Sequence, residues 1–203
     1  MSGRIILASG SAIRRDILDG AGLDYEVMVR PVDEAAIKSA MLAENTRLRD
    51  IADALAEAKA MRVSAQEAGF VIGADQIMVM KDERGVNQLF DKPKDMDEVR
   101  ARLLFMRGKK HELIGAIVIC ENGHPVWRHM SRTKLWVRNF SNAFLDKYIE
   151  VEGEALMKSV GAYRFEGPGA QLFEKVEGGF FATLGLDLLP VLDYLRSRGA
   201  VQS

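Results

Sequence analysis

The 203-residue sequence predicts an α/β fold built around a mixed sheet. Short apolar runs bounded by turn residues alternate with longer segments of helical periodicity, which is the pattern of strands alternating with helices. In addition, Asn122-Gly123 separates two long extended stretches at residues 112–120 and 125–137, and Asn-Gly is the strongest short-range signal for an antiparallel hairpin. A hairpin added to strand–helix units gives a sheet with parallel and antiparallel neighbours.

The first predicted strand covers residues 5–8, an apolar run that ends in small hydroxyl residues. A helix is predicted from Ala12, with Ser11 expected to cap its N-terminus. A tight turn at this junction directs backbone N–H groups and the positive helix end toward one point, which favours an anion. Because Arg14 and Arg15 follow, we interpret the segment as a phosphate-binding element. A solvated helix start is the alternative.

Further elements are predicted as a strand at residues 25–29, helices at 34–42 and 48–68, and a strand at 70–75 that continues as an extended segment at 77–80. Asp75 is thus placed at the end of an apolar strand, where α/β proteins position ligand-binding groups, although an N-cap or surface carboxylate is an equal alternative. Glu34 at a helix start is usually explained by the helix dipole. Lys59, on the long helix, would ordinarily point at water.

The second half is predicted to contain a charged turn at residues 81–87, a helix at 95–106 closed by Gly108, the hairpin, a helix at 141–151 capped by Ser141, a glycine-rich region at 161–185 and a last helix at 188–198. Lys92 precedes a proline that stiffens the backbone, and a solvated lysine is the alternative to a functional one. Glu166 could accept hydrogen bonds from a purine edge, or it could lie exposed on a structured loop.

Composition sets limits on function. The apolar fraction is 48%, the charged fraction is 28% and the formal net charge is −1. Such a balance gives no global field toward nucleic acid or an anionic membrane, so neither partner is expected. The single cysteine, Cys120, reads as a buried core residue, and the protein is expected in a reducing cytoplasm. The three histidines lack the companion residues of a structural zinc site.

Five collinear motifs make the pattern specific: Leu7-Ala8-Ser9-Gly10-Ser11, Val71-Ile72-Gly73-Ala74-Asp75, Lys92-Pro93, Gly108-Lys109-Lys110-His111 and Gly185-Leu186. Through them the chain resembles the bacterial Maf family of nucleoside triphosphate pyrophosphatases over nearly its whole length. The resemblance implies a Maf/ITPase-like mixed twisted sheet with flanking helices, two lobes around a central cleft, and a single domain over residues 1–203.

The resemblance also implies the reaction, in which water attacks near the α-phosphate to give a nucleoside monophosphate and pyrophosphate. A divalent cation, Mg²⁺ or Mn²⁺, is implied as cofactor, with Asp75 and Glu34 near the metal. Asp75 matches the catalytic acid of the family, and Lys59 and Lys92 match basic positions that line the cleft. Positions matching the phosphate loop are Ser9, Ser11 and Arg14.

The loop departs from the family pattern Ser-x-Ser-Pro-Arg-Arg. Ala12 replaces the proline, which loosens the expected helix start. Ile13 occupies the first arginine position and Arg14 the second, so Arg15 lies one step beyond the motif.

Three positions that sort the family by base are Ile13, Gln76 and Glu166. The branch that acts on 7-methyl-GTP typically carries Trp, Gln and Glu there, and the branch that acts on dTTP and UTP carries Arg, Thr and Gln. The chain therefore leans toward 7-methyl-GTP, and the Glu166 carboxylate suits the two donors of a guanine edge. Ile13 does not provide the aromatic face that would stack on a methylated purine.

Two other functions stay open at this point. One is a dTTP- or UTP-preferring pyrophosphatase. The other is a non-catalytic nucleotide-binding regulator of cell division or septum formation. A homodimer is implied by the resemblance alone.

Overall fold

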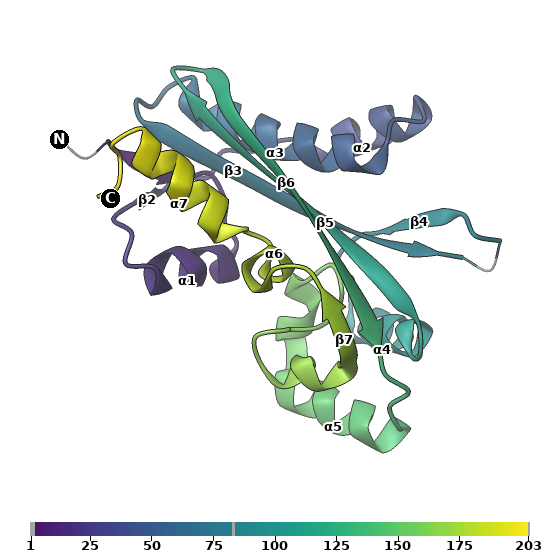
Figure 1. Ribbon diagram of the computed structural model, residues 1–203. Coiled ribbons are helices and arrows are strands. Elements are labelled where there is room, and N and C mark those ends of the chain that lie inside the picture. The colour runs from purple at the N-terminus through teal and green to yellow at the C-terminus, as the bar shows by residue number, and fades with distance from the viewer. Residues whose placement is uncertain (1–2, 83, 203) are drawn as a thin grey trace. The chain divides into compact units, whose positions relative to one another are not determined.

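The computed structural model describes residues 3–82 and 84–202 (Figure 1). Along the chain the elements are β1 (Ile5–Leu7), α1 (Ala12–Gly20), β2 (Glu26–Val27), α2 (Glu34–Ala43), α3 (Leu48–Ser64), β3 (Phe70–Lys81), β4 (Asn87–Phe90), α4 (Met96–Met106), β5 (Lys110–Glu121), β6 (His124–Val137), α5 (Asn142–Glu152), the short 3₁₀ helices η1 (Gly153–Lys158) and η2 (Pro168–Leu172), β7 (Phe173–Glu177), α6 (Phe180–Leu184) and α7 (Leu188–Ser197).

The described residues divide into two compact units. Unit 1 takes its residues from 1–76, 115–131 and 179–203, and unit 2 from 77–114 and 132–178. The long strands β3, β5 and β6 each contribute residues to both units.

The strands described belong to a seven-stranded sheet of order β2-β1-β3-β5-β6-β7, with β4 paired to β3. β1 is parallel to β2 and to β3, with Ile6 opposite Val71, whereas β4 is antiparallel to β3 and β7 is antiparallel to β6. This arrangement confirms the predicted α/β class with a mixed sheet and flanking helices.

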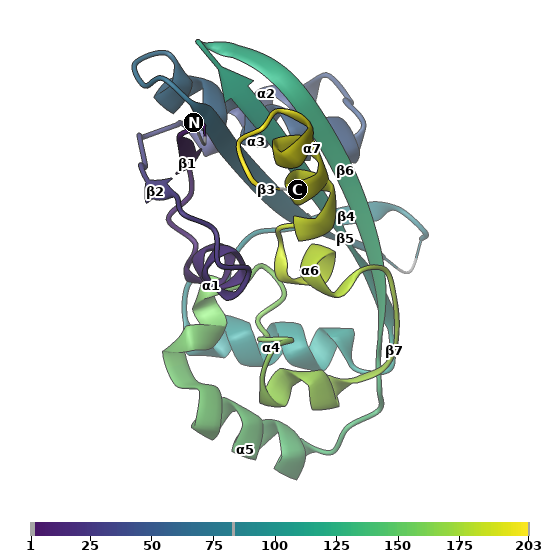
Figure 2. The ribbon, with the colours of Figure 1, turned by 60° about the vertical axis from the view of Figure 1, so that its left-hand side comes forward.

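In unit 1, the two faces of β3 have different neighbours. Ile72 and Ala74 pack in a core cluster with Leu18 of α1 and Val191 of α7. Gly73 points the other way, because successive strand residues alternate between faces. A Cβ added to Gly73 would lie 2.2 Å from the carbonyl oxygen of Ala56 in α3. Figures 1 and 2 accordingly show α3 and α7 on opposite sides of β3.

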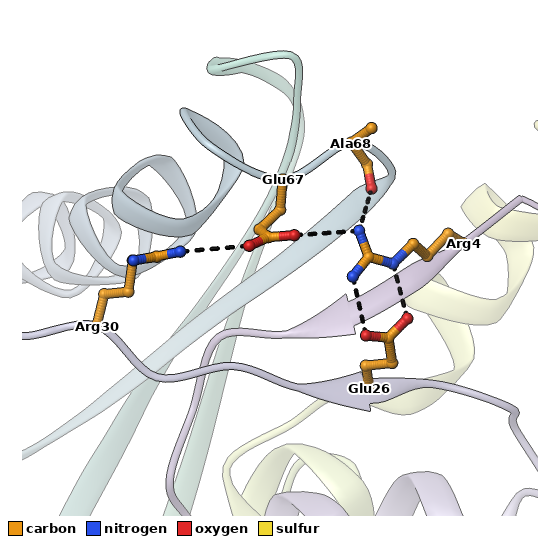
Figure 3. A network of polar contacts seen from close by, with 5 residues as sticks. All are labelled: Arg4, Glu26, Arg30, Glu67 and Ala68. Atoms are coloured by element: carbon orange, nitrogen blue, oxygen red, sulfur yellow. Dashed lines mark hydrogen bonds and ion pairs between the residues drawn. The ribbon is translucent and has the colours of Figure 1, made fainter.

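A network of charged side chains joins three segments of unit 1 (Figure 3). Arg4 donates to Glu26 through Nε at 2.7 Å and through Nη2 at 2.9 Å, and it reaches Glu67 at 3.2 Å. Glu67 also accepts from Arg30 at 3.3 Å. The network therefore ties the residue before β1, strand β2 and the segment after α3 together at the protein surface.

Unit 2 has its own apolar core, which includes Met78, Leu103, Met106, Leu135, Phe140 and Leu145. The guanidinium of the buried Arg102 donates at 2.8 Å to the carbonyl oxygen of Val160 and at 2.8 Å to Glu98, and it also donates to the carbonyl oxygen of Asp91. In the same unit, His111 Nε2 lies 2.8 Å from the hydroxyl of Tyr163.

Most expected elements are confirmed within a few residues of their predicted ends. Asn122 and Gly123 both have positive φ, 52° and 77°, as the predicted hairpin turn requires. Ser141 caps α5 by accepting from the N–H of Phe144 at 3.1 Å. Cys120 is buried, as expected.

Two expectations are wrong, and one strand was not predicted. β3 continues to Lys81, so Asp75 lies in the middle of a strand and not at its end. The apolar run after Asp75 keeps the strand in the sheet, where β4 pairs with it at residues 78–81. No strand was predicted at β4, which begins at Asn87, where the predicted charged turn ends. Ser11 occupies the N-cap position of α1, but its side chain makes no capping hydrogen bond. Its backbone N–H donates to Ser9 Oγ at 3.4 Å.

Candidate functional site

Two carboxylates in unit 1 meet at one ammonium group. Lys59 Nζ on α3 lies 2.6 Å from Asp75 Oδ1 on β3 and 3.1 Å from Glu34 Oε1 on α2. The Asp75 side chain is 12% exposed, the Lys59 side chain 16% and the Glu34 side chain 50%. The cluster is thus covered at Asp75 and open to solvent at Glu34.

The local sequence explains why these groups meet. Gly73 and Asp75 share the β3 face toward α3, and the missing side chain at Gly73 lets α3 approach β3 closely. Lys59 lies three residues after Ala56, which is the contact of Gly73, so it reaches Asp75. Asp33 caps α2 by accepting from the N–H of Ala36 at 2.9 Å, which leaves Glu34 to face Lys59.

A second polar cluster in unit 1 lies at the start of α1. Arg14 Nη1 donates to Ser9 Oγ at 3.0 Å, and Arg14 Nε donates to the carbonyl oxygen of Gly185 at 2.9 Å. Burial lowers the pKa of Arg14, while the carboxylates of Asp75 and Glu34 act in the opposite direction. The two carboxylates therefore attract the guanidinium electrostatically, and Arg14 keeps its positive charge.

The side-chain amide of Gln76 is also fixed within unit 1. Its nitrogen donates to the carbonyl oxygen of Ala182 in α6 at 2.8 Å. Ile13 packs against the apolar core cluster of unit 1. Arg15, by contrast, is exposed.

Unit 1 therefore holds most of the site residues expected from the sequence: Ser9, Ser11, Ile13, Arg14, Glu34, Lys59, Asp75 and Gln76. Lys92 and Glu166 belong to unit 2. Lys92 is exposed between β4 and α4. Glu166 accepts from Arg164 Nε at 3.0 Å, and Arg164 also pairs with Glu152 at 3.2 Å.

The residues fit a divalent cation that shares its coordination with substrate. Mg²⁺ is usually held by one or two carboxylates and completed by phosphate oxygens and water. Asp75 and Glu34 supply two carboxylates that converge on the same ammonium group. Among residues 3–82 and 84–202, no group of three or more His, Cys, Asp or Glu could form an all-protein cage.

Sequence reasoning missed the contribution of main-chain carbonyls from the region of α6. The carbonyl oxygens of Ala182 and Gly185 hold Gln76 and Arg14. The motif Gly185-Leu186 marked this position, and the φ of 100° at Gly185 explains the glycine. The pattern gave no sign of which side chains the carbonyls would meet.

Comparison with known proteins identifies the family. A family model described as Maf-like protein matches residues 4–198. A nucleoside triphosphate pyrophosphatase of Caulobacter vibrioides is 50% identical over 197 residues, covering 97% of this chain and 96% of the relative. A protein of the same name from Hyphomonas neptunium is 47% identical, covering 98% of both chains. A 7-methyl-GTP pyrophosphatase of Rhizobium meliloti is 41% identical, also over 98% of both.

No described helix has the length and apolar character that a membrane crossing requires. The matches confirm the expected family and the expected enzyme class, a hydrolase. The match over residues 4–198 includes residues of both units. The chain belongs to the Maf-like family of proteins.

Proposed function

We propose that the protein hydrolyses a nucleoside triphosphate to the nucleoside monophosphate and pyrophosphate with the help of a divalent cation. The observation that carries this proposal is the contact of Lys59 with Asp75 and Glu34, in the same electrostatic environment as Arg14. Carboxylates that can orient water, together with cations that can bind phosphate, are the parts that phosphoryl hydrolysis needs.

Each group has a role in this proposal. Arg14 and Ser9 bind phosphate oxygens. Asp75 orients the attacking water and accepts its proton. The water oxygen bonds to the α-phosphorus, the bond from that phosphorus to the bridging oxygen breaks, and pyrophosphate leaves. Lys59 holds the carboxylates in place. A bound Mg²⁺ or Mn²⁺ would be held by Asp75 and Glu34, and it would offset negative charge on the phosphates.

The test is pyrophosphate release from purified protein with Mg²⁺ or Mn²⁺. Asp75→Asn keeps the side-chain size and removes the base, so we expect a loss of at least about 100-fold in kcat. Asp193→Asn, at an exposed position of α7, is the matched control and should retain wild-type activity. No release from any nucleotide by the wild type, with binding preserved, would favour a non-catalytic nucleotide-binding regulator.

We further propose a preference for 7-methyl-GTP. Gln76 and Glu166 match the corresponding family branch, and the Rhizobium meliloti relative carries that name. The Glu166 carboxylate would exchange its contact with Arg164 for the two donors of a guanine edge. A panel of 7-methyl-GTP, GTP, dTTP and UTP tests this proposal. Faster turnover of dTTP than of 7-methyl-GTP would refute the preference and leave the hydrolysis proposal intact.

We also propose that the protein is cytoplasmic and forms a homodimer. A cytoplasmic protein is supported by the free and buried thiol of Cys120. A homodimer follows from the family resemblance alone, and the molar mass in solution would test it. No feature of the net charge of −1 favours nucleic acid as a partner.

A further inference from the structure

One short segment of unit 1 holds two residues of the candidate site. The carbonyl oxygen of Ala182 accepts from Gln76 Nε2 at 2.8 Å, and the carbonyl oxygen of Gly185 accepts from Arg14 Nε at 2.9 Å. Gln76 lies on β3 and Arg14 on α1, so the two side chains reach the segment from different elements. The carbonyl oxygen of Ala182 also accepts from the N–H of Gly185 at 3.2 Å, which closes the end of α6, so Gln76 is its second donor.

The chemistry of these carbonyls decides which end of the Gln76 amide faces them. Carbonyl oxygens only accept, so the amide nitrogen must point to Ala182, since the flipped amide would place oxygen against oxygen. The amide oxygen of Gln76 therefore points away from the Ala182 carbonyl. A Cβ built on Gly185 would lie 3.6 Å from Gln76 Oε1 and 3.7 Å from Arg14 Nη2. Gly185 therefore lies between the two functional side chains.

The backbone of Gly185 sets this geometry. Residues with a Cβ rarely adopt its φ of 100°. At this residue the chain leaves α6. The turn of α6 is reinforced by Thr183, whose hydroxyl donates to the carbonyl oxygen of Gly179 at 2.9 Å.

We propose that residues 182–185 form a positioning element that orients Arg14 and Gln76 together. The carbonyl of Gly185 sets the plane of the guanidinium that binds phosphate. The carbonyl of Ala182 makes Gln76 an acceptor, so that it recognises an N–H donor on the base. This inference rests on the proposed function for its substrate, and it adds that phosphate binding and base recognition are coupled through one turn.

The first test is Gly185→Ala, with Gly199→Ala as its control. Both glycines have positive φ in unit 1, 100° and 68°, so both substitutions introduce backbone strain, and a Cβ on Gly199 would have no neighbour within 4 Å. We expect Gly185→Ala to raise KM about tenfold, with a smaller change in kcat. The kcat/KM values for different nucleotides should also become more similar. Gly199→Ala should leave KM and kcat unchanged. Equal kinetics for the two variants would overturn the inference.

The second test is a double-mutant cycle with Arg14→Lys, which keeps the charge and removes the Nε donor. If Gly185 acts through Arg14, Gly185→Ala adds little to the effect of Arg14→Lys. In the double variant of Gly199→Ala and Arg14→Lys, the fold-change in KM should equal the product of the two single fold-changes. Independent effects of Gly185→Ala and Arg14→Lys would contradict the proposed coupling. Comparison of melting temperatures ensures that each variant is folded.

A binding measurement separates this inference from the proposed function. Inorganic pyrophosphate should raise the Tm of the wild type and of Gly199→Ala, and should raise the Tm of Gly185→Ala markedly less. Wild-type binding of pyrophosphate that depends on Gly185, without hydrolysis of any nucleotide, would refute the function and support the positioning element. Hydrolysis by the wild type, with equal pyrophosphate binding by both glycine variants, would support the function and refute the positioning element. Neither binding nor hydrolysis by the wild type would refute both.

Discussion

A covered polar pair in unit 1 is ionic, whereas a covered polar pair in unit 2 is neutral. In unit 1, Lys59 and Asp75 are mostly covered and form a 2.6 Å ion pair. In unit 2, His111 and Tyr163 are 1% and 5% exposed and form a 2.8 Å hydrogen bond between uncharged groups. Burial lowers the pKa of His111 to about 3 and raises the pKa of Tyr163, so both side chains are neutral at pH 7.

The difference shows how a covered side chain becomes reactive or structural. Burial alone favours the neutral form, because a charge loses its hydration. An opposite charge at hydrogen-bond distance offsets that loss, and the pair can then act on an anionic substrate. Unit 1 places charged groups at its candidate site, whereas the buried pair of unit 2 supports packing around Phe173.

The largest effect is expected at the glycine that lets the charged pair of unit 1 form. Gly73→Ala would place a Cβ 2.2 Å from the carbonyl oxygen of Ala56 and 2.8 Å from the backbone nitrogen of Ala60. Because both contacts are backbone atoms, α3 must shift, and Lys59 shifts with it. We expect kcat/KM to fall about 100-fold and the Tm to drop.

Gly20→Ala is the control for this substitution, since a Cβ at Gly20 in α1 has no neighbour within 4 Å. It should be neutral or slightly stabilising, because alanine is the better helix former. Wild-type activity of Gly73→Ala would show that the approach of α3 to β3 does not set the site.

The neutral pair of unit 2 should make stability depend on pH. The pKa of His111 is about 3 in the folded protein against an ordinary value of 6.5, so below pH 6.5 the unfolded chain binds a proton that the folded chain does not. Stability from this group is therefore present above pH 6.5 and is lost as the pH falls toward 3. Between pH 7 and 4.5 we expect a loss of about 2–3 kcal/mol.

Urea unfolding at the two pH values measures this loss, and His111→Phe should remove the His111 part of it. His124→Gln, at an exposed histidine, is the matched control. An unchanged pH dependence in His111→Phe would mean that His111 does not titrate differently on folding.

A smaller effect is expected when the charged pair of unit 1 loses its cation. Lys59→Met leaves Asp75 and Glu34 without their shared partner, and we expect kcat/KM to fall about tenfold. Lys59→Arg should retain more activity because it keeps the charge. Lys147→Met, at an exposed site on α5, serves as the control. Equal activities of Lys59→Met and the wild type would remove Lys59 from the proposed mechanism.

The smallest effect is expected for charges that stay in water. Arg4→Gln breaks the network of Figure 3, whose Arg4 and Glu26 side chains are 39% and 49% exposed. We expect a slightly lower Tm at low ionic strength and no difference in about 0.5 M salt, because ions screen exposed pairs. A lower Tm that persists at high salt would show that the network is shielded from ions, as the covered pair of unit 1 is.

The sequence predicted the elements whose signals are local. Asn122-Gly123 specified the hairpin, and Ser141 specified a helix start, since both act through their own backbone or the next turn. It did not predict where β3 ends, because an apolar run after Asp75 reads alike as a strand or as a connection. Only pairing with β4 decides that point.

The candidate site was predicted in part for the same reason. Asp75 and Arg14 lie in motifs that the sequence displays. The contact of Lys59 with both carboxylates depends on how closely α3 packs at Gly73, which is a tertiary property. The carbonyls of Ala182 and Gly185 carry no side-chain signature, so their partners emerge only from the folded chain.

Cys120 in β5 offers a chemical reporter of folding in unit 1. Its side chain is buried, and burial raises the pKa of its thiol to about 11, so the reactive thiolate is scarce at neutral pH. A maleimide should therefore label the native protein very slowly, at a rate set by the opening of this part of the sheet. As the only cysteine in the sequence, Cys120 makes the labelling rate a direct readout of how often unit 1 unfolds.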